Sequence, residues 1–253
     1  MRLARQVAAE LDPGRTSAVV LVGSWARGDA HVASDVDLWV VGARARRPHR
    51  NLERGGRLVT VRYTTEAHDL RELRNSARMD GAVSGWRRAQ VLWDPNGAAA
   101  RLRRAARRIR WRDLRGARDR YVAHQLAGWA EEVRKLLRAM ETGERETASV
   151  QRNLLATHLP VLRAAQLEVR GDSENGLWER TARRAGPAFR AAMRSALGTD
   201  GGDWRGSCEG ALRLYALTAG ASLPTLAGEP RRIVLATCRR AGYPIDEARS
   251  KER

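Results

Sequence analysis

Two aspartates separated by a single residue are the part of this sequence best suited to chemistry. Asp35 and Asp37 stand in the run Asp-Val-Asp-Leu-Trp-Val-Val, whose other residues are those of a buried strand. Alternate side chains on a strand point to the same face, so both carboxylates project together. Neighbouring carboxylates repel each other, and a divalent cation removes that conflict. Because the ligands are hard oxygens and the run itself contains no histidine or cysteine, we predict a Mg²⁺ site at Asp35 and Asp37.

The preceding apolar run ends in Gly23-Ser24, which is suited to binding phosphate. Glycine lets a ligand approach the backbone closely, and the serine hydroxyl and nearby N–H groups can bind phosphate oxygens. Arg27 is a candidate helper in this role. Gly-Ser turns and isolated Asp-x-Asp patterns are each common. Together, at the ends of neighbouring strands, they indicate phosphoryl-type transfer, in which phosphates are positioned and their charge is neutralised by metal.

The elements that position these residues alternate between strand and helix up to about residue 110. Runs rich in Val, Leu, Thr or Tyr, separated by Gly or Pro, predict strands at 17–22, 35–41, 57–64 and 89–93. Helical patterns occupy 66–78 and 97–109, and the N-terminus forms an amphipathic helix with Leu3, Val7 and Leu11 inward. We therefore predict an α/β (α+β) domain with a small mixed sheet over residues 1–110.

Strand signals vanish after Trp111, which predicts an all-α helical bundle over residues 111–245. Apolar residues recur every three or four positions along a long helix at 112–141. A second helix spans 146–170, with Pro160 expected to kink it. Shorter helices follow at 176–185, 187–197, 206–220 and 229–241, and residues 246–253 are expected to be a frayed tail.

The stretch Gly23–Val41, GSWARGDAHVASDVDLWVV, resembles the signature of the polymerase-β-like nucleotidyltransferase superfamily. The resemblance is clear over 19–42 and weaker to about residue 93. It implies that the Gly-Ser turn binds a nucleoside triphosphate, ATP or another NTP, and that the paired aspartates hold two Mg²⁺ ions. The helical remainder is similar in layout to kanamycin- and lincosamide-type antibiotic nucleotidyltransferases. That likeness implies an acceptor-binding role for the second domain.

One departure from that family concerns a third carboxylate, which its members usually carry on a later strand. The best-aligned position here is Thr60, which cannot replace a charged ligand. Either Glu66 or Asp69 substitutes, or the alignment differs, or the second metal is held weakly. A slow or non-catalytic member of the family therefore stays open.

Glu131 and Lys135 are four residues apart on one face of the long helix. The simpler interpretation is a surface ion pair that contributes a few tenths of a kcal/mol. Lysine is rare in this chain, however, and kanamycin-type enzymes resemble this arrangement, with a glutamate base near a lysine. That resemblance implies a catalytic Glu131 and a nucleotide-binding Lys135. Arg118 and His124 are spaced as in the helical nuclease toxins that partner minimal nucleotidyltransferases, although such spacing is easily met in an arginine-rich chain.

The net charge of +18 comes almost wholly from arginine, since only Lys135 and Lys251 are lysines. Arginine with abundant alanine and glycine is typical of GC-rich coding sequences, so the charge alone does not select a partner. The segment 101–120 holds ten arginines, which form either a solvated helix face, the simpler interpretation, or a phosphate or RNA track. Nonspecific nucleic-acid binding is compatible with this charge.

The sequence predicts a cytoplasmic enzyme that does not span a membrane. Cys208 and Cys238 are far apart, which favours a reducing compartment, and no apolar run is long enough for a membrane helix. We expect transfer of a nucleoside monophosphate, AMP from ATP, to a hydroxyl of a small molecule such as an antibiotic, with release of pyrophosphate. Transfer to a tRNA end or a protein hydroxyl, as in toxin–antitoxin pairs, and a non-catalytic nucleotide-binding module are the alternatives. A homodimer also stays open.

Overall fold

The computed structural model describes residues 2–11, 16–42, 48–75, 77, 81–169, 171 and 176–245. The chain divides into two compact units between Leu114 and Arg115, four residues beyond the boundary expected at residue 110. The expected tail at 246–253 lies outside the described residues. Within the part of the chain that the structure describes, every helix is too short or too polar to cross a membrane.

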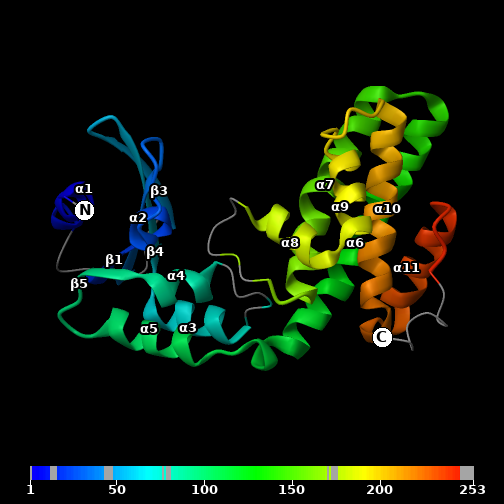
Figure 1. Cartoon of the computed structure of the whole chain (residues 1–253). Helices are drawn as coiled ribbons and strands as arrows, with labels where there is room; N and C mark the ends of the chain where they lie inside the picture. Colours follow the sequence, from blue (N-terminus) through cyan, green and yellow to red (C-terminus); the bar gives the residue numbers. More distant parts are fainter. Residues whose placement is uncertain are drawn as a thin grey trace. The chain divides into compact units, whose positions relative to one another are not determined.

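The first unit is built on a mixed five-stranded sheet with the strand order β3-β4-β2-β1-β5 (Figure 1). Strand β2 pairs in parallel with β4 and antiparallel with β1, while β3–β4 and β1–β5 are antiparallel pairs. The strands are β1 (Thr16–Val22), β2 (Val36–Gly42), β3 (His49–Arg54), β4 (Arg57–Thr64) and β5 (Gln90–Trp93).

Helices cover both faces of this sheet. Helix α1 (Arg2–Ala9) buries Ala4 and Val7 against one face, where they join Leu21, Leu38 and Val61. The opposite face packs against three helices, which lie together in Figure 1, and its core includes Val20 and Val41 of the sheet. These helices are α3 (Glu66–Asn75), α4 (Ala82–Arg88) and α5 (Ala98–Arg108).

Strand β3 is the strand that the sequence pattern did not predict. Its residues, His-Arg-Asn-Leu-Glu-Arg, are mostly polar and exposed, because it is an edge strand held by backbone pairing to β4. The turn that joins the two strands is Gly55-Gly56, with both residues at positive φ. A two-residue turn of this kind matches the twist of a β-hairpin. The local sequence feature that is typical of a hairpin here is therefore the glycine pair, and not the polar residues of β3.

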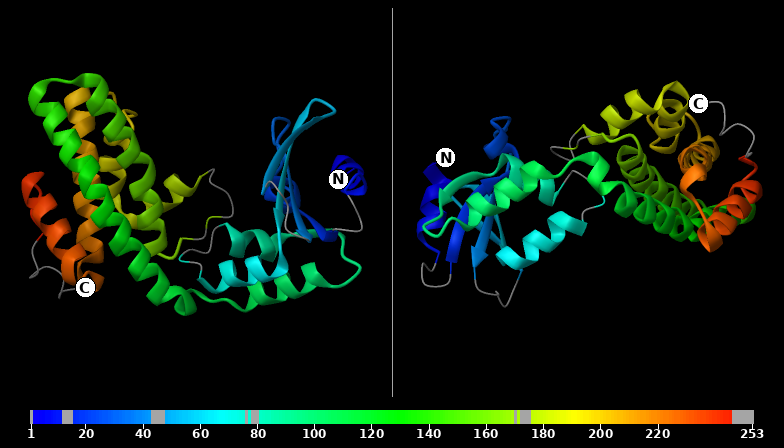
Figure 2. Two further views of the ribbon diagram at one scale, coloured as in Figure 1. Left: turned by 180° about the vertical axis from the view of Figure 1, so that it is seen from behind. Right: turned by 90° about the horizontal axis from the view of Figure 1, so that it is seen from below.

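The second unit contains six α-helices among its described residues, and its two longest, α6 and α7, run side by side (Figure 2). Leu126, Val133, Leu155 and Leu159 are fully buried between its helices. The helices are α6 (Arg115–Thr142), α7 (Arg145–Gln166), α8 (Leu177–Ala185), α9 (Pro187–Ala196), α10 (Trp204–Ser222) and α11 (Gly228–Arg240). The predicted fold class, a small mixed sheet with helices followed by a helical region, is confirmed.

Candidate functional site

Gly23 and Asp37 lie against each other where β1 and β2 meet. Val22, the last residue of β1, is the register partner of Asp37, so Gly23 begins the short helix α2 (Gly23–Arg27) directly beside the carboxylate. A Cβ placed on Gly23 would lie 2.1 Å from Asp37 Oδ2, and Gly23 has a φ of +68°. Glycine is therefore required here both by the backbone conformation and by the approach of the carboxylate.

The electrostatics of the site centre on Asp37. Partial burial and the neighbouring charge of Asp35 raise the pKa of Asp37 to about 6, while the positive charge of Arg27 opposes that rise. Asp35 lies immediately before β2 and is partly buried. Asp35, Asp37 and the Gly23–Arg27 turn are thus brought to one place, as the sequence pattern predicted. The two carboxylates repel each other and are incompletely compensated by protein groups.

Three contacts hold helix α2 in position. The Gln90 side chain donates to the Ala26 carbonyl over 2.8 Å, and the Trp25 indole donates to the Ser34 carbonyl over 3.5 Å. Arg57 stacks over the Trp25 ring at 5.3 Å. The Gln90 contact was not predicted, because it joins residues 64 positions apart. A segment fixed in this way has little conformational entropy left to lose on binding any ligand.

Arg27 lies at the end of α2 with its side chain only 12% exposed, and it pairs with Asp29 over 3.1 Å. Its positive charge acts to lower the pKa of Asp37. Ser24 is partly buried, and its carbonyl accepts the backbone N–H groups of Gly28 and Asp29. The turn is therefore closed by its own backbone.

Thr60 is the direct register partner of Asp37 in the parallel pair β2–β4. Paired residues of neighbouring strands project from the same face, so Thr60 occupies the position from which a third carboxylate could join Asp37. Among the described residues, no group of three or more His, Cys, Asp and Glu side chains could hold a metal ion. The carboxylates at this site therefore stand as a pair.

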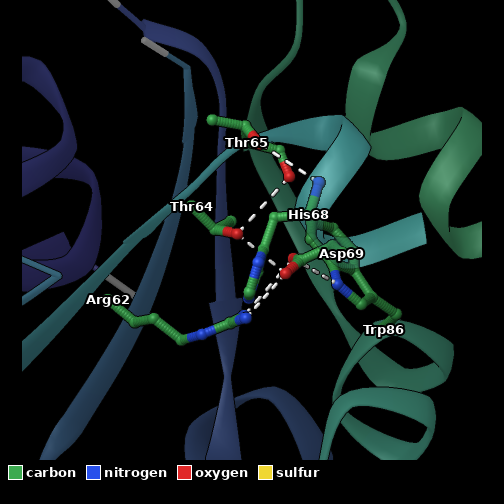
Figure 3. A network of polar contacts seen from close by, with 6 residues as sticks. All are labelled: Arg62, Thr64, Thr65, His68, Asp69 and Trp86. Carbon is green, nitrogen blue, oxygen red and sulfur yellow. Dashed lines mark hydrogen bonds and ion pairs between the residues drawn. The ribbon is translucent and has the colours of Figure 1, made fainter. Parts of the chain in front are cut away.

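The two acidic residues considered as substitutes for Thr60 are engaged elsewhere. Glu66 forms a two-pronged ion pair with Arg101, over 2.6 and 2.7 Å. Asp69 is fully buried and accepts from Arg62 over 2.6 Å, with further bonds to Thr64 and Trp86 (Figure 3). Thr64, which donates to Asp69, pairs with Val41 of β2. Val41 lies four residues along the strand from Asp37, a separation of about 13 Å. Asp69 therefore fastens β4 to α3 and α4, away from Asp37.

Trp39 lies two residues after Asp37 and projects from the same face of β2. It contacts both Arg62 and Trp86, which are hydrogen-bond donors to Asp69. The Arg62 guanidinium lies 4.7 Å over its ring, and the Trp86 ring meets it edge-on at 5.3 Å. A Cβ on Gly85 would lie 2.2 Å from the Trp39 ring, so α4 approaches closely at this glycine. The sequence pattern did not predict these contacts around Trp39, because the residues that make them come from four separate elements, β2, β4, α3 and α4.

Glu131 and Lys135 lie on α6 in the second unit. Lys135 Nζ is 2.6 Å from Glu131 Oε1, and the Glu131 side chain is 69% exposed. The bond to Lys135 lowers the pKa of Glu131. The local geometry is that of a surface ion pair, and the catalytic role stays a prediction. Arg118 is buried and pairs with Glu168 over 2.9 Å, whereas His124 is exposed.

Comparison with known proteins agrees with the fold. Residues 1–77 match the family described as "Nucleotidyltransferase domain", so this part of the chain carries such a domain. No curated protein matches the chain. The crystal structure of a nucleotidyltransferase-like protein from Exiguobacterium sibiricum 255-15 is similar, with a TM-score of 0.53 and 14% identity. The match covers 94% of this chain and 78% of that one, and at this identity it shows a shared fold alone.

Proposed function

We propose that the protein is a Mg²⁺-dependent nucleotidyltransferase that moves a nucleoside monophosphate, AMP from ATP, to a hydroxyl of a small-molecule acceptor. The observation that supports this most is the approach of Gly23 to Asp37. It sets the turn that begins at Gly23 beside the carboxylate of Asp37, within the segment that matches the nucleotidyltransferase domain. In this proposal Gly23, Ser24 and Arg27 bind the triphosphate, with Lys135 as a further contact.

The residues present fit a divalent metal. Asp35 and Asp37 offer hard oxygen donors and carry like charges at close range, and Arg27 is a compensating charge for Asp37. When bound there, Mg²⁺ supplies charge neutralisation of the phosphates. We expect one ion to be held by the pair, and a second more weakly, because the partner of Asp37 on β4 is Thr60 rather than a carboxylate.

Transfer to a hydroxyl also requires a base that takes its proton. In the first unit Glu66 and Asp69 are committed to Arg101 and Arg62. Glu131 of the second unit is our candidate base, supported by its exposure and by the positive charge of Lys135, which keeps it ionised. The net charge of +18 favours an acceptor that is not strongly cationic, which counts against an aminoglycoside-like antibiotic.

Thr60 favours a second candidate function, a nucleotide-binding module that does not catalyse transfer. A macromolecular acceptor, a tRNA end or a protein hydroxyl, is the other alternative for the same site. One assay separates these functions. The protein is incubated with Mg²⁺ and each labelled triphosphate, alone and with hydroxyl compounds, tRNA or protein, and pyrophosphate release is followed.

Pyrophosphate release that depends on a small hydroxyl compound and is lost in Asp35→Asn and Asp37→Asn supports the proposal. Metal-dependent triphosphate binding without pyrophosphate release under any condition identifies the binding module. Full transfer activity in both aspartate variants would refute the site.

A further inference from the structure

Helix α5 and the short segment after it carry four exposed arginines whose guanidinium groups have no acidic partner among the described residues. The helix sequence, AAARLRRAARR, contains five arginines and no acidic residue, so no ion pair can form within it. Arg104, Arg107, Arg108 and Arg110 are exposed, and none of their guanidinium groups has an ion-pair or hydrogen-bond partner among the described residues. The backbone N–H of Arg110 donates to the Asp113 carboxylate over 2.8 Å. We call these four residues the α5 arginine row.

The arrangement of the row is unfavourable for the helix by itself. Arg104 stands three residues before Arg107 and four before Arg108, positions that are neighbours on a helix surface. Like charges at this spacing destabilise a helix. Some exposed arginines of this chain are paired within their helix, as Arg183 is with Glu179 and Arg232 with Glu229. A bound polyanion would compensate the row.

The helix holds the row rigidly. The Asp94 carboxylate accepts the backbone N–H groups of Ala99 and Ala100 at the start of α5, over 3.1 and 3.0 Å. At its end, the Arg87 guanidinium donates to the carbonyls of Ala106, over 2.9 Å, and Ile109. A ligand therefore meets a helix that is already ordered and has little entropy left to lose.

The surroundings of the row favour phosphate over other partners. The apolar side of α5, which includes Leu102 and Ala106, is buried in the core, so no apolar face is left to enter a bilayer. Trp111, the aromatic residue that follows the row, is partly buried against the same core and is not free as a platform on which bases could stack. Arginine is the side chain best matched to phosphate oxygens, because its donors form a planar fork.

We propose that the α5 arginine row binds the phosphate backbone of a nucleic acid, independently of base sequence. Arg104 and Arg108 are about 6 Å apart along the helix axis, and several phosphates of one strand can be contacted together. The surface lies within the first unit and is built from residues other than those of the candidate site. The proposal therefore does not depend on nucleotidyl transfer.

The experiment measures the binding of two fluorescein-labelled 20-bp DNA duplexes of unrelated sequence by fluorescence anisotropy, from 50 to 300 mM salt. The test variant is Arg104→Gln/Arg107→Gln/Arg108→Gln. The matched control, Arg184→Gln/Arg190→Gln/Arg213→Gln, removes the same charge from exposed arginines of α8, α9 and α10. Asp37→Asn and MgATP binding serve to separate this surface from the candidate site.

We expect the α5 variant to weaken binding of both duplexes by about tenfold or more at 100 mM salt. The slope of log K against log salt should fall by about two to three, because each phosphate contact contributes about 0.9. The control triple variant should change affinity less than twofold, Asp37→Asn should leave duplex binding intact, and the α5 variant should keep MgATP binding.

Equal loss in both triple variants would show that overall charge, not this row, binds DNA, and would overturn the proposal. So would the absence of binding by the unaltered protein at 50 mM salt, or strong selectivity for one duplex. Competition by poly-glutamate as effective as that by unlabelled duplex would assign the row to acidic proteins instead.

Discussion

Asp37 on β2 and Thr60 on β4 are direct partners in a parallel pair, so the candidate metal site has a hydroxyl where a third carboxylate could stand. This pairing explains why the carboxylates form a pair rather than a cluster. It also yields a test in which one added charge changes metal affinity.

Thr60→Asp should increase the affinity for Mg²⁺ several-fold, because it adds a hard oxygen ligand beside Asp37. Without metal the same variant should be less stable than the unaltered protein, because a third like charge joins Asp35 and Asp37. Thermal unfolding across a Mg²⁺ titration measures both effects. Asn51→Asp is the control, since Asn51 is the partner of Thr60 one strand further from Asp37. If Mg²⁺ raised the unfolding temperature of both variants equally, the placement of Thr60 beside the metal site would be contradicted.

Asp37→Asn should stabilise the metal-free protein at pH 8 by about 1–2 kcal/mol and have little effect at pH 4. The folded protein holds a proton on Asp37 up to about pH 6, whereas the unfolded chain loses it near 3.8. The free energy of unfolding therefore falls as pH rises through this window, and the asparagine removes that cost. Calorimetry at the two pH values measures the sign of the change in unfolding free energy caused by Asp37→Asn. With saturating Mg²⁺ that sign should reverse. If Asp37→Asn were less stable than the unaltered protein at pH 8 without metal, the raised pKa of Asp37 would be contradicted.

Gly23→Ala should abolish Mg²⁺-dependent triphosphate binding. The added Cβ would meet Asp37 Oδ2 at 2.1 Å, so the carboxylate must move. Gly28→Ala is a matched control, because Gly28 also has positive φ, at +84°, but open space around its Cβ position. The control should lose about 1–2 kcal/mol of stability through backbone strain and still bind triphosphate. Isothermal titration of both variants with MgATP decides whether the contact or the strain matters.

Asp69→Ala should destabilise the protein by about 3–5 kcal/mol, because it leaves the Arg62 guanidinium and the Trp86 N–H without their buried acceptor. Glu66→Ala, on the same helix, should cost under about 1 kcal/mol, since its Arg101 partner is 51% exposed. Urea unfolding followed by tryptophan fluorescence compares the two. If Asp69→Asn stayed fully folded yet lost Mg²⁺ binding, Asp69 would be a ligand rather than a fastening residue.

Glu131→Gln should lower the transfer rate by about 10²–10⁴-fold and leave triphosphate affinity unchanged, because a base acts on the acceptor proton only. Lys135→Ala should instead weaken triphosphate binding. Glu141→Gln is the control, an exposed glutamate of the same helix. Single-turnover rates and binding titrations separate the two effects. A silent Glu131→Gln would leave the Glu131–Lys135 contact as a surface ion pair only.

The sequence alone determined the parts of the site that lie close together in the chain. Gly23, Ser24, Asp35 and Asp37 belong to one strand–turn–strand segment, so their types and spacing predicted the juxtaposition that the structure contains. The change from mixed elements to helices was likewise visible, because hydrophobic periodicity is a local property.

Only the tertiary structure decided which distant residues meet. The partner of Asp37 depends on the register of β2 against β4, and packing between non-neighbouring segments sets that register. The roles of Glu66 and Asp69 followed from Arg101 and Arg62, which approach them from other elements. Strand β3 formed despite its polar residues, because its stability comes from backbone bonds to β4 rather than from burial of its own side chains.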